Sequence, residues 1–175
     1  MGNMLTQPSP NQIWYTSSDG AVINPTALYF SAKIVSNSYD EGWGIITFNR
    51  PVTEIGWNAF LENKKLTSIV FPSGVTEIAD GACQGCTALQ KVVMPDSVRY
   101  IRDGAFQDCR KLTSVTIGVS TEVTKTDNNM FNGCTRLQSV NLNTAFPNLK
   151  TIGNSAFAGC TSLTSLDLSS MSSLT

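Results

Sequence analysis

The sequence repeats itself from residue 52 onward. Successive units span residues 52–74, 75–97, 98–122, 123–148 and 149–175, and their starts lie 23, 23, 25 and 26 positions apart. Periods of about 20–50 residues are typical of solenoids and related repeat architectures. A unit this short cannot bury its own apolar side chains, so the units must stack and share one continuous core.

Each unit combines a strand pattern with a turn-rich segment. In the first unit this pattern is Leu66-x-x-Ile69-x-Phe71, whose alternation over the last residues predicts a short strand with one face inward. The turn-rich segment, residues 52–60, predicts another short strand followed by a turn and about one helical turn. Equivalent leucines should stack in one ladder: Leu66, Leu89, Leu112, Leu137 and Leu163. Equivalent phenylalanines should form a second ladder, in which Cys83 takes one place: Phe60, Phe106, Phe131 and Phe157.

The units share the pattern I-G-x-x-A-F-x-x-C-x-x-L-x-x-[IV]-x-[IL]-P, which closely resembles the leucine-rich repeats of BspA-like surface proteins of Bacteroides-type bacteria. The resemblance covers residues 52–168. It implies a leucine-rich-repeat solenoid, rich in β structure, whose parallel strands alternate with short helical or irregular convex segments. It also implies an extracellular or cell-surface location and, in some members, adhesion to host proteins or other cells. The departures from the pattern are Asn63 for Cys, Thr126-Asp127 for Ile-Gly, and Gly118, Asn143 and Ser169 for Pro.

Residues 11–51 do not follow the repeat and are predicted to form an N-terminal β cap. The segments 12–16 and 21–23, separated by the turn signal Ser-Ser-Asp-Gly, predict a hairpin. Further strands are predicted at 34–35 and 45–48, with a polar stretch between them. Residues 1–10 are predicted to be a flexible tail.

The sequences at the two ends of the chain lead to two further expectations. The first residues lack the basic and apolar regions of a signal peptide, so we expect a targeting segment to have been removed. Leu174 and Thr175 resemble the start of a sixth unit, so we expect a truncated array. An uncovered repeat end exposes strand edges, which predicts dimerisation through the C-terminal end.

The composition excludes several classes of function. Histidine is absent, which excludes Ser-His-Asp and Cys-His catalysis and histidine metal ligands. The 12 basic and 13 acidic residues show no basic patch of the kind that nucleic-acid binding requires. No stretch approaches the ~20 apolar residues of a membrane span. Glu54 and Glu77 share a repeat position and are interpreted as surface charge rather than a hydrolytic pair. We therefore expect neither an enzyme nor a cofactor or metal site.

Four of the five cysteines, Cys86, Cys109, Cys134 and Cys160, recur at the repeat spacing and indicate a buried structural ladder. Neighbouring units lie roughly 4.8 Å apart, which exceeds the ~3.8 Å between Cβ atoms in a disulfide, so free thiols are expected. Asn63 holds the same position in the first unit. This supports a structural role for the position, since the side chains of Asn and Cys can both donate a hydrogen bond to a turn carbonyl. Cys83 and Cys86 form a C-x-x-C, for which packing is favoured over redox or zinc chemistry because a second pair and histidine are missing.

The candidate binding residues lie on the concave side of the solenoid. Side chains that alternate with the inward strand residues form two rows: Ser68, Lys91, Ser114, Ser139 and Ser165 in one, and Val70, Val93, Thr116, Asn141 and Asp167 in the other. Protein interfaces favour Trp, Tyr and Arg anchors, and the candidates for these lie in or near the cap: Trp14, Tyr15, Trp43 and Trp57. Trp43 lies in a polar stretch, where it either contacts a ligand or covers the end of the core.

These observations favour a non-enzymatic cell-surface or secreted module that binds a protein partner on host or other cells. Two alternatives stay open. The chain is an exported glycan-binding protein that uses cap aromatics such as Trp43, or a structural spacer that displays another domain.

Overall fold

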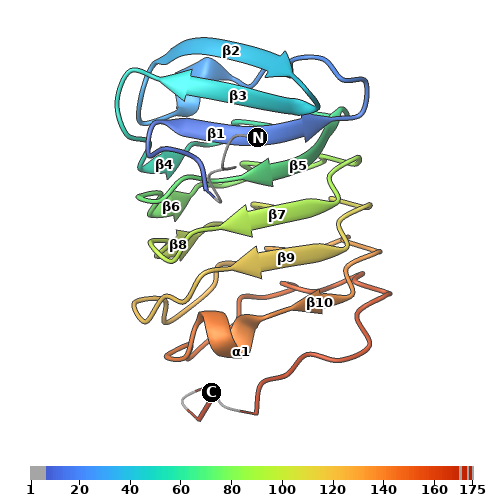
Figure 1. Ribbon diagram of the computed structural model, residues 1–175. Coiled ribbons are helices and arrows are strands. Elements are labelled where there is room, and N and C mark those ends of the chain that lie inside the picture. The colour runs from blue at the N-terminus through green and yellow to red at the C-terminus, as the bar shows by residue number, and fades with distance from the viewer. Residues whose placement is uncertain (1–6, 170, 173, 175) are drawn as a thin grey trace.

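The computed structural model describes residues 7–169, 171, 172 and 174, and it shows a solenoid whose units stack along one axis (Figure 1). Each unit runs as a strand along one side, turns, and returns through a second short strand and a run of tight turns. Within the described residues, regular helix is confined to two short segments, η1 (Ala27–Tyr29) and α1 (Leu142–Ala145). The predicted β-rich leucine-rich-repeat solenoid is confirmed.

One sheet of seven strands, here called the main sheet, runs the length of the described chain in the order β10-β9-β7-β5-β1-β3-β2. The repeat strands are parallel, whereas β1 is antiparallel to both of its neighbours, β3 and β5. The cap and the repeats therefore share a single sheet. Its strands are β1 (Gln12–Ser17), β2 (Ile34–Asp40), β3 (Trp43–Phe48), β5 (Leu66–Val70), β7 (Lys91–Met94), β9 (Ser114–Ile117) and β10 (Ser139–Val140).

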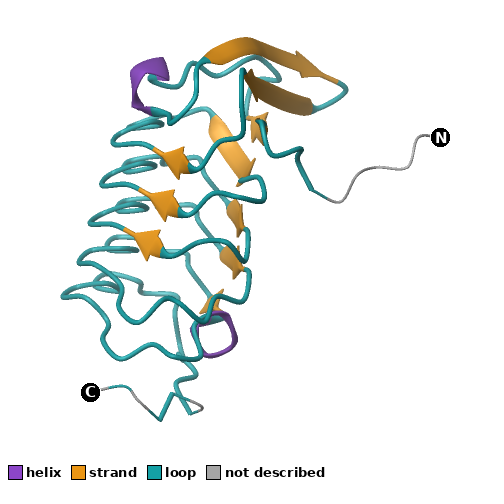
Figure 2. Cartoon of the chain, turned by 90° about the vertical axis from the view of Figure 1, so that its left-hand side faces the viewer, coloured by secondary structure: helices purple, strands orange, loops and turns teal. Residues whose placement is uncertain are grey.

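A smaller parallel sheet lies on another side of the solenoid (Figure 2). It consists of β4 (Glu54–Ile55), β6 (Glu77–Ile78) and β8 (Tyr100–Ile101). An isolated bridge between Lys125 and Thr151 continues the same pairing in the later units. These strands are the short ones predicted at the start of each unit.

The convex segment of each unit is a run of turns, so the predicted helical turn is wrong. In the first unit, the N–H groups of Ala59, Leu61 and Asn63 donate to carbonyls three residues earlier. The intervening N–H groups donate instead to carbonyls of the next unit. Asn58 and Glu62 have φ of 53° and 52°, and a residue in this left-handed conformation interrupts a right-handed helix. The same two places in later units also have positive φ, at Gly81 and Gly85, Gly104 and Asp108, Asn129 and Gly133, and Ser155 and Gly159.

The core between the sheets contains the two predicted ladders. Leu66, Leu89, Leu112 and Leu137 are completely buried, whereas Leu163 is only partly buried. The rings of Phe106, Phe131 and Phe157 stack with centroids 5.6 and 5.7 Å apart. Cys83 is buried at the position between Phe60 and Phe106. The stacked side chains give the units a shared core, as the repeat requires.

The cap contains a hairpin, but not the predicted one. β2 and β3 form it around Glu41 and Gly42, whose φ values of 46° and 86° are those of a type I′ turn. Most of the polar stretch before β3 therefore belongs to the strand β2. Its polar side chains are compatible with a strand, because side chains such as Ser38 and Asp40 face solvent.

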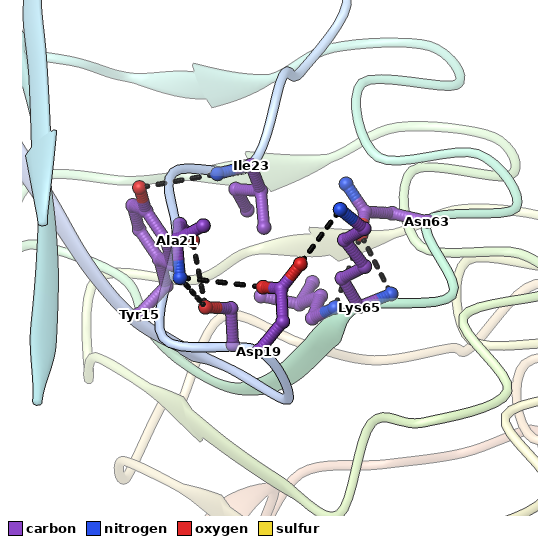
Figure 3. Close-up of polar contacts among 8 residues, drawn as sticks. Tyr15, Asp19, Ala21, Ile23, Asn63 and Lys65 are labelled. Carbon is purple, nitrogen blue, oxygen red and sulfur yellow. Dashed lines mark hydrogen bonds and ion pairs between the residues drawn. The ribbon is translucent and has the colours of Figure 1, made fainter.

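Residues 21–23 do not pair with β1, because side chains already hold them (Figure 3). The Ala21 N–H donates to Ser17 Oγ at 3.0 Å, and the Ile23 N–H donates to the Tyr15 hydroxyl at 3.3 Å. An ion pair of 2.7 Å between Asp19 and Lys65 ties this loop to the first repeat. The loop therefore connects the cap to the repeats instead of forming a strand.

Candidate binding face

The side of the main sheet that points away from the core, here called the outer face, is the side predicted to be concave. Seven of the predicted residues lie on it in register. Ser68, Lys91, Ser114 and Ser139 are consecutive partners across four strands, and Val70, Val93 and Thr116 are partners across three. The residues between them, such as Ile69, Val92 and Val115, are buried. The alternation of strand side chains thus separates this face from the core.

The cap extends both rows on the same face. Trp14 pairs with Val70 on one side and with Ile45 on the other, so it continues the row that holds Val93. Thr16 pairs with Ser68, and the hydroxyls of these two residues form a hydrogen bond of 2.6 Å. The outer face is therefore continuous from the cap to the repeats, which the sequence did not indicate.

Trp43 lies on this outer face, on the strand next to β1. Its ring contacts that of Trp14 edge to face, with centroids 6.4 Å apart, and 39% of the residue is exposed. Its neighbour Gly44 faces the other way, where a side chain would collide with the ring of Tyr15. Trp43 and Trp14 thus form an aromatic pair at the cap end of the outer face. Trp14 lies between Ile45 and Val70 in one row, whereas the register of β1 and β3 puts Trp43 beyond Thr16, at the end of the row that holds Ser68.

The other two aromatic candidates lie elsewhere. Tyr15 is completely buried, and its hydroxyl donates to Asn37 Oδ1 at 2.8 Å. Burial raises the pKa of the Tyr15 hydroxyl above its ordinary value. Trp57 is 55% exposed in the turn that follows β4, where its ring packs against Tyr29. Neither residue contributes to the outer face.

Asn141 is not part of the outer row. It comes directly after β10 and precedes α1, and its amide turns towards β9. The Ile117 N–H donates to Asn141 Oδ1 at 3.2 Å, and Asn141 Nδ2 donates to the Ile117 carbonyl at 3.0 Å. The side chain thereby takes the place that the backbone of a longer β10 would occupy.

Ser165 and Asp167 are exposed but lie beyond the main sheet, because residues 163–168 form no strand. The carboxylate of Asp167 is engaged locally. It accepts hydrogen bonds from Asn143 Nδ2 at 2.6 Å and from the Ser169 N–H at 3.0 Å. The hydrogen bonds from Ser169 lower the pKa of the Asp167 carboxyl. The helix α1 redirects the chain after β10, so the last predicted strand has no edge in register to join.

The surface depressions lie away from the aromatic pair. One of about 450 Å³ is bounded by the loop at Val22–Asn24 and by residues 62–65. Others of about 390 and 250 Å³ lie beside Leu28 and Arg50, and beside Gln84 and Arg110. None of these three depressions includes Trp14 or Trp43.

The five cysteines are free and buried, as predicted. Each repeat-spaced thiol donates to a carbonyl one unit earlier, at 3.0–3.1 Å, where Phe60, Cys83, Phe106 and Phe131 accept. Asn63, in the equivalent position, accepts hydrogen bonds from the Lys65 and Leu66 N–H groups, so the predicted donation to a carbonyl is wrong there.

The C-x-x-C pair has the environment of core residues. A hydrogen bond with Cys86, together with burial, raises the pKa of the Cys83 thiol well above its ordinary value. A thiolate is the form that attacks disulfides and binds metals, and this environment disfavours it. Over the described part of the chain, no group of three or more Cys, Asp or Glu side chains is arranged to hold a metal ion.

Glu77 takes part in an ion-pair network on the small sheet. Arg102 Nε donates to Glu77 Oε1 at 2.7 Å, and Arg102 also lies 3.6 Å from Asp127. The interaction with Glu77 raises the pKa of the Arg102 guanidinium. Glu77 therefore pairs with a cation of the following unit, an arrangement that serves packing between units rather than acid–base chemistry.

No helix in the described residues has the length and apolarity needed to cross a bilayer. A family profile described as "BspA type Leucine rich repeat region (6 copies)" matches residues 46–175. No curated protein matches the sequence.

Three solved bacterial structures are similar. A leucine-rich-repeat protein of Treponema pallidum is 27% identical, with a TM-score of 0.43, over 57% of each chain. A leucine-rich cell-surface protein of Faecalibacterium prausnitzii is 32% identical, with a TM-score of 0.42, over 55% of this chain and 30% of that one. A leucine-rich-repeat protein of Bacteroides ovatus is 25% identical, with a TM-score of 0.49, over 76% of this chain and 37% of that one. The chain thus spans less than two thirds of the length of each.

Proposed function

Because the chain belongs to the BspA-type leucine-rich repeat family, we propose that it is a non-enzymatic binding module of a bacterial cell surface. Its outer face binds a protein partner on host or other cells. The observation that carries the proposal is the continuity of this face, which places Trp14 and Trp43 beside the rows of the repeats.

The chemistry of the outer face fits a protein partner. Tryptophan is among the residues that contribute most at protein interfaces. Here Trp14 lies within an apolar row with Ile45, Val70 and Val93, and Trp43 contacts it from the neighbouring row. Small hydroxyl side chains line the parallel row, at Thr16, Ser68, Ser114 and Ser139. An apolar strip with a polar border matches the usual anatomy of a protein interface.

A glycan is the second candidate, because Trp43 exposes part of its ring at the surface. Sugars and small ligands favour concave sites that enclose much of their surface. The three depressions described above do not include Trp14 or Trp43, which favours a protein over a glycan. A role as a spacer remains the outcome if the outer face binds neither class.

The test is a binding screen of the whole chain against an array of purified extracellular-matrix proteins and, in parallel, an array of glycans. For a protein hit, we expect Trp43→Ala to weaken binding by at least about tenfold, as for a central interface anchor. Lys91→Glu should also reduce binding, because it reverses a charge in the middle of the face.

Trp57→Ala is the matched control, since it removes an exposed tryptophan that lies away from the outer face. Equal losses for Trp43→Ala and Trp57→Ala would contradict the proposed face. A glycan hit that Trp43→Ala abolishes would replace the protein proposal with carbohydrate recognition. Binding to neither array would favour the spacer.

A further inference from the structure

The strand β2 forms the cap end of the main sheet, and its outer edge has no neighbouring strand (Figures 1 and 2). Asp40 and Trp43 close the hairpin, and Ser38 and Ser36 continue the pairing with β3. In such an antiparallel pair, alternate residues direct their N–H and C=O groups to the partner strand. Asn37 and Tyr39 therefore direct theirs away from β3, whereas Val35 lies in the irregularity of the pairing between Ile34 and Ser36. Within the described residues, no backbone hydrogen bond joins these groups to another segment.

From Ser36 to Asp40, this edge lacks the features that usually prevent strand addition. Natural edge strands are often very short, or carry proline or a central lysine. β2 has seven residues, contains no proline, and has its only charged residue, Asp40, at its end. The one irregularity in its pairing lies between Ile34 and Ser36, at the other end. The stretch from Ser36 to Asp40 is therefore an open template for another strand.

The charges that flank β2 are self-complementary. Lys33 precedes the strand and Glu41 follows it, each four residues from Asn37. Both side chains are exposed, and neither forms an ion pair with a described residue. If two such strands run antiparallel about Asn37, Lys33 of each copy comes near Glu41 of the other, just beyond the ends of the paired stretch.

We propose that two copies of this chain associate through antiparallel pairing of their β2 strands, centred on Asn37. The Asn37 residues face each other, and Ser36 faces Ser38 of the second copy. The dimer has two-fold symmetry, in which the same surface is used by both copies, and the seven strands of each main sheet join into fourteen.

The opposite end of the sheet is a weaker template. There β10 has only two residues, Ser139 and Val140, and the Asn141 amide already occupies the next position along β9. The sequence predicted dimerisation through the C-terminal end, whereas the strand edges favour the cap end. Substitutions distinguish the two interfaces. A substitution in or beside β2 changes the association if the cap end is the interface, and a substitution at the C-terminal end changes it if that end is the interface.

Sedimentation equilibrium of the whole chain tests the association. We expect a concentration-dependent species of twice the 18.9 kDa monomer mass. Lys33→Glu alone, or Glu41→Lys alone, should lower the association constant by about tenfold, because two attractive pairs become repulsive. The combined variant should regain most of the loss. Lys111→Glu is the control for net charge and should leave the association unchanged.

Cross-linking tests the register. Residues facing each other in a non-hydrogen-bonded antiparallel pair have Cα atoms about 4.5 Å apart, within the range that a disulfide spans. We expect oxidation to link a mixture of the Ser36→Cys and Ser38→Cys proteins into a dimer, while either protein alone stays unlinked. Linking of one variant with itself, a chain that stays monomeric at every concentration, or an association indifferent to Lys33→Glu would overturn the proposal.

Discussion

At the scale of the residue, the repeat-spaced cysteines act as buried donors between units. Each thiol reaches a backbone carbonyl of the preceding unit that lies inside the core. A buried carbonyl without a partner costs about 1–3 kcal/mol, and a thiol is small enough to supply the bond without disturbing the stack. Asn63 has a different role because it turns back to accept from its own loop.

The thiols also give the stability of the fold a dependence on pH. Burial raises the pKa of Cys160 from 9.0 to about 11 and also raises the pKa of Cys109 above its ordinary value. The folded state therefore binds more protons than the unfolded state above pH ~9. Below pH ~9 we expect these thiols to cause no change in the free energy of unfolding. As the pH rises from ~9 through ~11, we expect the free energy of unfolding to fall. Urea unfolding at pH 8 and pH 10.5 measures this loss of stability. The Cys160→Ala protein should lose less stability between the two pH values than the unchanged protein, and an equal loss in both would contradict the prediction.

The sequence predicted free, buried thiols because their spacing equals the repeat. It could not predict which atoms the thiols contact, since the acceptors are backbone carbonyls of another unit and carry no side-chain signal. Asn141 shows the same limit. The position of Asn141 in the repeat predicted an outward side chain. Its amide instead forms hydrogen bonds with the backbone of Ile117, at the edge of β9 that β10 leaves unpaired.

At the scale of the element, the strands of the main sheet shorten along the solenoid. β5 has five residues, β7 and β9 have four, and β10 has two. The shortening coincides with α1, which takes the chain away from the sheet after Asn141. The predicted rows consequently end at Ser139 and Thr116.

Asn141→Ala tests how the array tolerates this shortened strand. The change removes both partners of Ile117, whose side chain is buried, and we expect the free energy of unfolding to fall by about 1–3 kcal/mol. Urea denaturation followed by circular dichroism measures it. Ser139→Ala, on the exposed side of the same strand, should change stability by less than about 0.5 kcal/mol. Similar losses for both variants would show that the amide does not hold the edge.

The repeat strands were predictable because their apolar alternation is strong, whereas the pairing of the cap was not. β1 was predicted as a strand, but its neighbours are β3 and a repeat strand some fifty positions away. Nothing local in the sequence specifies such a partner. For this reason Trp43 was predicted as a candidate by itself, and its contact with Trp14 and the repeat rows became visible only in the structure.

At the scale of the whole molecule, the units are joined by bonds that recur from one unit to the next. Backbone hydrogen bonds, thiols and leucines all connect equivalent positions. In such an array, stability is approximately a sum of unit and neighbour contributions. One complete unit is therefore removable without loss of the register.

Deletion of residues 75–97 is the corresponding experiment. We expect a folded chain in which Phe60 packs directly on Phe106, because the unit that contains Cys83 is gone. The urea m-value should fall by roughly an eighth, in proportion to the surface lost. Deletion of residues 75–86 alone is the control, since it breaks the register and should abolish cooperative unfolding. Loss of folding in both deletions would show that the units are not interchangeable.

The position of β1 determines the order in which the protein can assemble during synthesis. The strand β1 leaves the ribosome before the repeats, yet one of its two neighbours, β5, ends at Val70. At about 5–20 residues per second, several seconds separate the emergence of the two strands. The cap therefore cannot fold ahead of the repeats, and the first repeat completes the cap as much as the cap covers the first repeat.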